Sequence, residues 1–254
     1  MALVSAAWRT LDAELACWRD AGRDVEFWWR DDDATTPSAS LGRVLALSAE
    51  AQVPLALAVI PLAAAQELFA DLRCAVLMHG TDHRNRAPAG EKKSEYPFAE
   101  PDGLALERLR KAKERLAALA GEAFVPVLAP PWNRFKRHLA PRLPEIGLCG
   151  LTAYGPRARH EAAAGVLEVN THVDIIDWHG TRGFVGEEAA LAAAVKHLAA
   201  RRAGAADRGE PTGWLTHHAL HDSAANDFLE RLFERTRRLG ARWLDARTLF
   251  PSPS

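Results

Sequence analysis

The chain has 254 residues, a formal net charge of −1 at pH 7 and a pI near 6.8, so its charge does not indicate nucleic acid or an anionic membrane as a partner. Hydrophobic residues make up 48% and charged residues 26%, as in an ordinary globular protein, and no apolar run is long enough to predict a membrane span. This length fits one large domain, and (β/α) barrels often reach it.

The N-terminal segment has the pattern of an amphipathic helix. Trp8, Leu15 and Trp18 recur at helical spacing, which predicts a helix over residues 4–21 that ends at Gly22, and not a signal peptide.

The three cysteines, Cys17, Cys74 and Cys149, are widely spaced in apolar runs. This pattern predicts buried free thiols and not disulfides, which favours a reducing, cytoplasmic location.

After the N-terminal helix, short β-like runs alternate with helical patterns, which predicts βα units around a parallel sheet. We expect one catalytic domain over residues 1–254, with residues 1–22 as an N-terminal helix, folded as a distorted (β/α)7-8 barrel; an open doubly wound sheet is the alternative. The expected strands are residues 25–30, 55–60, 74–79, 124–129, 148–153, 166–170, 172–176, 213–217 and 241–244. The expected helices are residues 4–21, 40–51, 62–72, 102–120, 137–146, 187–202 and 225–239.

Residues 84–101 interrupt this alternation. The segment is polar, rich in proline and glycine, and follows the end of an expected strand. Long irregular loops in a domain are often functional, so we predict a loop that covers a site; a plain insertion is the alternative.

Three consecutive carboxylates, Asp31, Asp32 and Asp33, follow the first apolar strand. Adjacent anions repel one another unless a cation holds them, which favours a metal or a cationic partner over a solvated turn. If the strand continues, Asp31 and Asp33 point to one side and Asp32 to the other. An N-cap cluster for the next helix is the structural alternative.

His79 and His83 lie at the end of another expected strand, four residues apart. One helical turn places both imidazoles on one face, as two ligands of a metal require. A chance pair of histidines is the alternative.

Three further polar groups follow strand ends, in the segments 129–134 (APPWNR), 174–179 (DIIDWH) and 214–222 (WLTHHALHD). The last segment has three histidines within five residues beside an Asp, which indicates proton transfer or ligand binding. Because the C-terminal ends of barrel strands converge on one face, all five groups predict one active site there.

In the order and spacing of these motifs, residues 25–249 resemble the polysaccharide deacetylase (NodB-homology, carbohydrate esterase 4) superfamily, in a divergent form. The resemblance implies a hydrolase that uses a divalent metal, most often zinc with iron, cobalt or nickel as alternatives, to remove acyl groups from amino sugars. It implies Asp33, His79 and His83 as metal ligands and Asp32 as the catalytic base. A slip of one residue, to Asp31 and Asp32, stays open.

Two positions depart from the family's motifs. Gly80 stands where the family has Ser or Thr, between the two metal-binding histidines. Ala129 stands where the family has an Arg before its proline, so Arg134 or Arg30 would have to replace that cation.

The remaining motifs imply the other site residues. The family's Asp and Trp correspond to Asp174 or Asp177 with Trp178. Its catalytic His corresponds to His217 or His218, with His217 preferred and His221 later in the chain. Trp132, Trp178 and Asn133 are expected to bind the substrate.

The expected partner is a glycan or other small substrate, with no nucleic acid and no membrane, and the sequence does not indicate an oligomeric state. A hydrolase of a small non-sugar amide, a metal-binding relative without activity, and a metal-free structural protein are the alternatives.

Overall fold

A computed structural model describes residues 5–251. The strands are β1 (Glu26–Ala34), β2 (Leu55–Val59), β3 (Ala75–Met78), β4 (Phe124–Leu128), β5 (Gly150–Leu151), β6 (Glu161–Ala163), β7 (Val166–Glu168), β8 (Val173–Asp174), β9 (Thr212–Thr216) and β10 (Arg242–Trp243). The α-helices are α1 (Ala6–Asp20), α2 (Ala39–Ala51), α3 (Asp102–Ala120), α4 (Glu187–Ala203), α5 (Ser223–Arg238) and α6 (Ala246–Leu249). Short 3-10 helices are η1 (Gln66–Phe69), η2 (Gly121–Ala123), η3 (Pro131–Asn133), η4 (Arg137–Ile146) and η5 (His218–Leu220).

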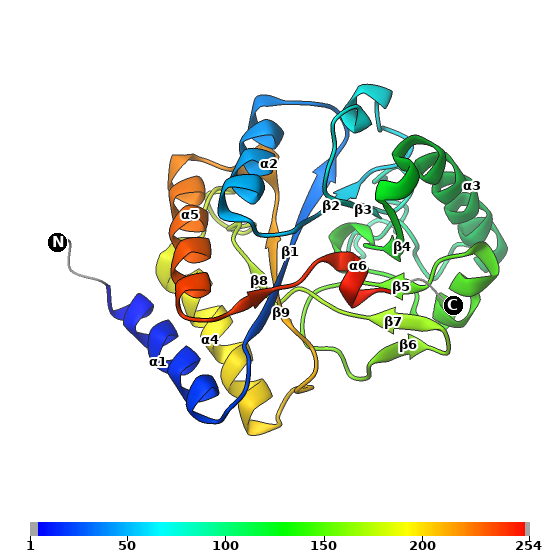
Figure 1. The fold of residues 1–254 in the computed structure, drawn as a ribbon. Coiled ribbons are helices and arrows are strands. Elements are labelled where there is room, and N and C mark those ends of the chain that lie inside the picture. The colour runs from blue at the N-terminus through cyan, green and yellow to red at the C-terminus, as the bar shows by residue number, and fades with distance from the viewer. Residues whose placement is uncertain (1–4, 252–254) are drawn as a thin grey trace.

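The strands form one sheet with the order β6-β7-β5-β4-β3-β2-β1-β9-β8, and β10 pairs with β1. All of these pairs are parallel except β6 with β7. Residues 169–172 connect β7 directly to β8, so the two ends of the parallel order return to each other. The helices lie outside the strands (Figure 1). The expected distorted (β/α) barrel is therefore confirmed.

Strand β1 shows how the sequence builds two cores. Phe27 and Trp29 belong to the large core between strands and helices, whereas Trp28 belongs to a smaller core inside the barrel. Strand residues alternate between two faces, so each β1 side chain is assigned to a side by its position. The inner core also contains Phe250, which follows α6, and α6 lies across the ring of strands in Figure 1.

Several expected elements differ from the structure. The helix expected over residues 62–72 is only the short η1, and residues 137–146 form a 3-10 helix that contains Pro141 and Pro144, whose missing N–H groups are incompatible with an α-helical ladder. The expected buried position of Cys17 is wrong, because this free thiol is exposed on α1. Strand β6 and helix α6 were not expected, and residue 4 of the first expected helix lies outside the described residues.

The segment of residues 84–101 has no helix or strand, as expected. It is nevertheless anchored: Glu95 and Tyr96 are fully buried, and Asn85 Oδ1 accepts hydrogen bonds from the backbone N–H groups of Ala87 and Ser94. The loop is therefore packed into the barrel mouth along part of its length.

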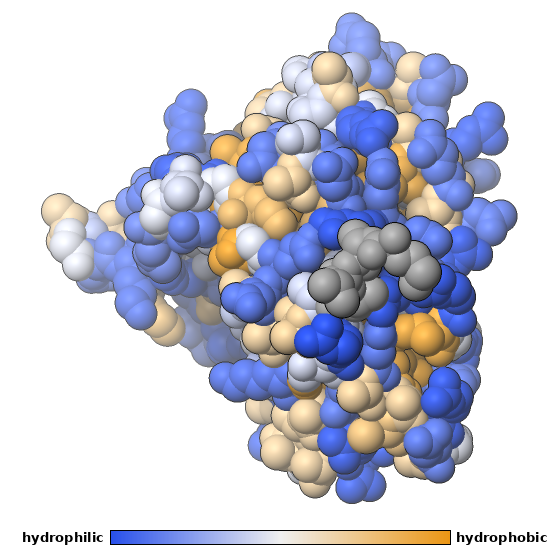
Figure 2. Space-filling view, turned by 90° about the vertical axis from the view of Figure 1, so that its left-hand side faces the viewer, coloured by the Kyte–Doolittle hydropathy of each residue, from blue (hydrophilic) through white to orange (hydrophobic). Residues whose placement is uncertain are grey.

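The outer face that carries α1, α4 and α5 is mainly hydrophilic, with hydrophobic residues in small separate patches (Figure 2). In the described part of the chain, no helix has both the length and the apolar character needed to cross a membrane.

Candidate active site

The C-terminal end of β1 carries the three carboxylates into the mouth of the barrel. Asp31 is in register with Leu57 of β2 and Thr216 of β9, but the pairing with β2 shifts between Asp31 and Ala34. Asp33 has a φ of 72° inside this irregular stretch. The bulge turns Asp33 away from simple alternation, so its side chain meets the histidines that follow β3.

Asp33, His79 and His83, hereafter the mouth cluster, bring one oxygen and two nitrogens together. Asp33 Oδ1 lies 3.1 Å from His79 Nε2 and 3.2 Å from His83 Nε2, yet this oxygen has no correctly aligned hydrogen-bond donor in the described chain. Ligand atoms around a tetrahedral zinc ion are separated by about 3.3 Å, given bonds of about 2.0 Å. The spacing and the unpartnered buried oxygen both fit a divalent metal.

Electrostatics within the mouth cluster follow from burial and mutual contact. Burial raises the pKa of Asp33, but the close contact with His79 and the charge of His79 outweigh burial and leave this pKa well below its usual range. Burial lowers the pKa of His79, but the charge of Asp32 and contact with Asp33 raise it above 6.5. Burial and the charge of His79 lower the pKa of His83.

Backbone strain is concentrated around the same cluster. Six non-glycine residues with positive φ occur in the described chain, and four of them are Asp33, His83, Trp132 and Asn133. A side chain at positive φ costs free energy that the surrounding structure must offset, and such residues gather at functional sites. The strain therefore marks the mouth of the barrel independently of the ligand geometry.

Arg30, one of the two candidates for the cation that the third motif lacks, pairs with Asp32. Its Nε and Nη2 donate to the two oxygens of Asp32 at 2.8 and 3.0 Å, and its Nη1 donates to the backbone and side-chain oxygens of Thr152. Nη2 also donates to Asn133 Oδ1 at 3.0 Å. Arg30 and Asp32 are two residues apart on one strand face, so a bidentate pair forms between neighbours.

Asp31 has a separate partner. Its two oxygens accept hydrogen bonds from Thr216 Oγ1 at 2.6 Å and His218 Nδ1 at 2.5 Å. Burial lowers the pKa of His218, but the hydrogen bond to Asp31 more than offsets it and raises this pKa above 6.5. Asp33 is thus a member of the mouth cluster, Asp32 lies beside His79 of that cluster, and Asp31 lies outside it.

His217 follows β9 and lies near Asp33 and Asp174. Its ring packs edge-on against Trp178 at 4.7 Å between centroids, and its charge lowers the pKa values of both Asp33 and Asp174. Burial is the larger effect on Asp174 and raises its pKa. Asp174 Oδ2 accepts a hydrogen bond from Trp178 Nε1 at 2.7 Å, whereas Asp177 accepts backbone N–H groups in the next turn. Asp174 is therefore the carboxylate that faces the site.

Trp132 packs against His83 at 4.6 Å between ring centroids, as expected for a wall of the site. Arg134 points elsewhere: it donates to the backbone oxygen of Lys93 at 2.8 Å and forms no ion pair within the described chain. Of the two arginines expected to replace the motif's cation, Arg30 contacts Asp32 and Arg134 does not.

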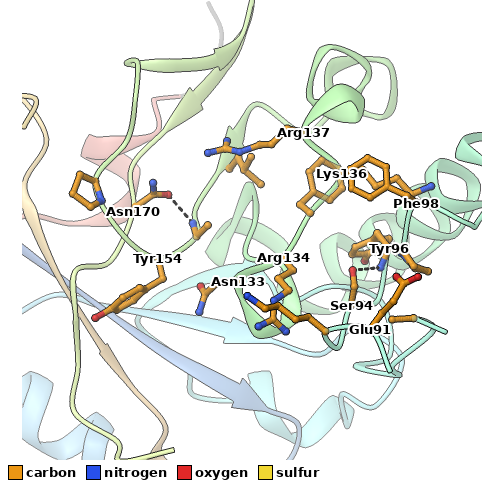
Figure 3. Close-up of a pocket in the computed structure, with 17 residues that line it drawn as sticks. Glu91, Ser94, Tyr96, Phe98, Asn133, Arg134, Lys136, Arg137, Tyr154 and Asn170 are labelled. Atoms are coloured by element: carbon orange, nitrogen blue, oxygen red, sulfur yellow. Dashed lines mark hydrogen bonds between the residues drawn. The ribbon is translucent and has the colours of Figure 1, made fainter. Parts of the chain in front are cut away.

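A groove of about 500 Å³ opens beside Asn133 (Figure 3). Its wall includes Tyr154, which follows β5 and is half-exposed. Of the expected site residues, Asn133 and Arg134 line the groove, whereas Asp32 and the mouth cluster do not. The lining residues are Ala87, Glu91, Lys92, Ser94, Tyr96, Pro97, Phe98, Asn133, Arg134, Phe135, Lys136, Arg137, Leu151, Ala153, Tyr154, Pro156 and Asn170.

A second group of metal-binding residue types, hereafter the lower cluster, is buried near the N-terminal ends of β8 and β9: His172 precedes β8, Glu210 precedes β9, and His197 lies on α4. The backbone N–H of Gly213 donates to His172 Nδ1 at 3.0 Å, so a neutral His172 carries its proton on Nε2, 3.3 Å from Glu210. The two imidazoles also stack nearly parallel at 3.4 Å, so one ion cannot lie in both ring planes. The lower cluster does not fit a metal.

The sequence did not single out Thr152, Tyr154 or Glu95. The first two follow β5 and reach the site only because β5 lies beside β4 in the sheet. Gly80 was a sequence signal for a residue packed against this turn, because the Glu95 carboxylate fills the space that a side chain at position 80 would occupy.

No protein-family model matches the sequence, and no curated protein matches it. Solved structures do match. A peptidoglycan N-acetylglucosamine deacetylase is 15% identical, with 91% of this chain and 90% of that chain covered and a TM-score of 0.56. The PuuE allantoinase is 13% identical, with 89% and 88% covered and a TM-score of 0.61. A CE4 family pseudoenzyme from Bacillus anthracis is 13% identical, with 86% and 63% covered and a TM-score of 0.53.

These likenesses establish the fold. The chain shares its fold with these deacetylases and with the allantoinase, so the fold that the motifs led us to expect is confirmed.

Proposed function

We propose that this protein is a metal-dependent hydrolase that removes an acyl group, such as acetyl, from an N-acylated sugar or glycoconjugate. The observation that carries the proposal is the mouth cluster of Asp33, His79 and His83 with Asp32 held beside it by Arg30. One carboxylate and two imidazoles suit zinc, with iron, cobalt and nickel as alternatives.

The chemistry divides among the residues of the site. A divalent ion held by the mouth cluster would supply Lewis acidity, which makes water a better nucleophile and stabilises negative charge on the carbonyl oxygen. Asp32 would accept the proton of the attacking water, with both of its oxygens oriented by Arg30. His217 would donate a proton to the departing nitrogen as the C–N bond breaks. Asp174 and Trp178 would keep that imidazole in place.

The groove supports a substrate larger than the acyl group alone. Its aromatic side chains include the half-exposed Tyr154, and aromatic faces are suited to pack against apolar faces of rings. Trp132, which packs against His83, and Trp178, which packs against His217, would bind the reacting sugar. A small non-sugar amide, the second candidate because an allantoinase shares the fold, would leave most of the groove empty.

The test uses the purified protein stripped with a chelator and reloaded with zinc. Acetate release from N-acetylated chitooligosaccharides only after zinc addition supports the proposal, and ring opening of allantoin with no acetate release supports the small-amide alternative. Stoichiometric zinc with no hydrolysis of either compound would indicate a non-catalytic relative. A protein that takes up no zinc, nickel, cobalt or iron would refute the proposal.

A further inference from the structure

Glu95 is a buried carboxylate in the irregular loop of residues 84–101, and it reaches the segment that joins the two metal-binding histidines. Its side chain is fully buried, and Oε1 accepts hydrogen bonds from the backbone N–H groups of Thr81 at 2.9 Å and Asp82 at 3.1 Å. Both amides lie between His79 and His83. One carboxylate oxygen therefore satisfies two backbone donors in the middle of the metal-binding loop.

Gly80 leaves the space that this carboxylate occupies. A Cβ at position 80 would overlap Glu95 Oε2 and would lie only 2.5 Å from Cδ of Pro131. Gly80 also has a φ of 62°, a conformation that costs any other residue free energy. The glycine that departs from the family's Ser or Thr is thus explained by the position of Glu95 together with Pro131.

The same loop holds the metal-binding segment at two further points. Tyr96 and Thr81 share a hydrogen bond of 3.0 Å between their hydroxyl groups. Arg86 donates to both oxygens of Asp82, at 2.8 and 2.7 Å, and its Nη1 lies 3.7 Å from Glu95 Oε1. Contacts from Glu95, Tyr96 and Arg86 therefore all connect residues 81–82 to the loop.

We propose that Glu95 is a positioning residue of the metal centre, which holds the 79–83 segment in the conformation that directs both imidazoles at Asp33. His83 has a φ of 56°, so the segment needs partners that keep it in this strained conformation. The loop of residues 84–101 is then an outer layer of the metal site and not only a cover. This inference rests on the proposed function, because it presupposes that the mouth cluster binds a metal.

The test measures zinc dissociation constants by chelator competition for the wild type, Glu95→Met and Glu95→Gln. Glu95→Met removes the acceptor and should weaken zinc binding about 10- to 100-fold, as is typical when a residue that orients metal ligands is lost. Glu95→Gln retains an acceptor oxygen and should stay within about threefold of the wild type.

Glu210→Met is the matched control. Glu210 is also fully buried, and its two oxygens accept the backbone N–H groups of Asn170 and Arg157, far from the metal-binding segment. Its loss should lower the melting temperature as Glu95→Met does, but it should leave the zinc dissociation constant unchanged.

Equal zinc affinity in Glu95→Met and the wild type would overturn the inference, and so would an equal loss in Glu210→Met. A wild type that binds no metal would instead refute the proposed function. If Glu95→Met does not fold, hydrogen exchange in the wild type decides: slow exchange of the Thr81 and Asp82 amides supports the contact, and exchange at the rate of an open loop contradicts it.

Discussion

Two clusters of two histidines and one carboxylate lie at opposite ends of this barrel. The mouth cluster follows the C-terminal ends of β1 and β3, and the lower cluster lies at the N-terminal ends of β8 and β9. In composition they are equivalent, but in the lower cluster a backbone N–H donates to a ring nitrogen of His172, and both oxygens of Glu210 accept backbone N–H groups.

The difference teaches that hydrogen bonds to the histidine rings, and not residue types, decide whether a cluster can bind a metal. In the lower cluster the Gly213 N–H occupies His172 Nδ1 and leaves the proton on Nε2. In the mouth cluster the Nε2 atoms of His79 and His83 face Asp33 from a strained backbone. A nitrogen that carries a proton has no lone pair for a metal.

Removing one histidine from each cluster tests this comparison with the largest expected effect. His79→Ala should reduce bound zinc from about one ion per chain to below about 0.1, because two ligands rarely hold zinc. His197→Ala should leave zinc content unchanged. Elemental analysis after dialysis measures both, and loss of zinc in His197→Ala would show that the lower cluster is the metal site.

Substitutions of the adjacent carboxylates Asp31 and Asp32 have the next largest expected effect. Asp32→Asn should retain zinc and lower kcat about 100- to 10,000-fold, because the amide cannot accept the proton of water. Asp31→Asn should affect kcat much less, since Asp31 bonds to Thr216 and His218. Steady-state assays on the zinc-loaded variants separate them, and an Asp32→Asn enzyme of full activity would place the base elsewhere.

His217 and His218 are also adjacent, and we expect one to act in catalysis and the other in stability. His217→Gln should lower kcat about 100-fold through loss of the general acid. His218→Gln should chiefly reduce stability, by about 1–3 kcal/mol, because it weakens the buried hydrogen bond to Asp31. Kinetics and denaturant unfolding on both variants check this, and the reverse pattern would assign the proton donor to His218.

The smallest effect is a pH dependence of stability. Burial raises the pKa of Glu95 from 4.5 to about 7. Its folded-state pKa is raised, so its contribution to stability is complete below pH 4.5 and is lost as the pH rises through about 7. In the metal-free protein, Glu95→Gln should therefore gain about 2 kcal/mol relative to the wild type between pH 5 and pH 8. Denaturant unfolding at both pH values measures the difference, and parallel pH profiles would contradict it.

The alternation and spacing of residues along the chain predict much of this fold, because they reflect the geometry of strands and turns. The alternation of Phe27, Trp28 and Trp29 assigns each to one core, and the same alternation places Arg30 and Asp32 on one face. The spacing of His79 and His83 likewise reflects short-range geometry. These features depend on neighbours in the chain, so the sequence alone contains them.

Features set by tertiary contacts could not be predicted. The positive φ of Asp33 arises where the pairing of β1 with β2 shifts, which alternation does not reveal. The hydrogen bond from Gly213 to His172 depends on strands that meet only in the folded sheet. The contact of Glu95 with residues 81–82 spans an irregular loop without any periodicity.

A crystal structure of the zinc-loaded protein, with anomalous diffraction recorded at the zinc edge, tests the central claim most directly. The expected result is one strong anomalous peak within about 2.2 Å of Asp33, His79 and His83, with none at the lower cluster. A peak between His172, His197 and Glu210, or no peak at the mouth of the barrel at saturating zinc, would contradict the assignment.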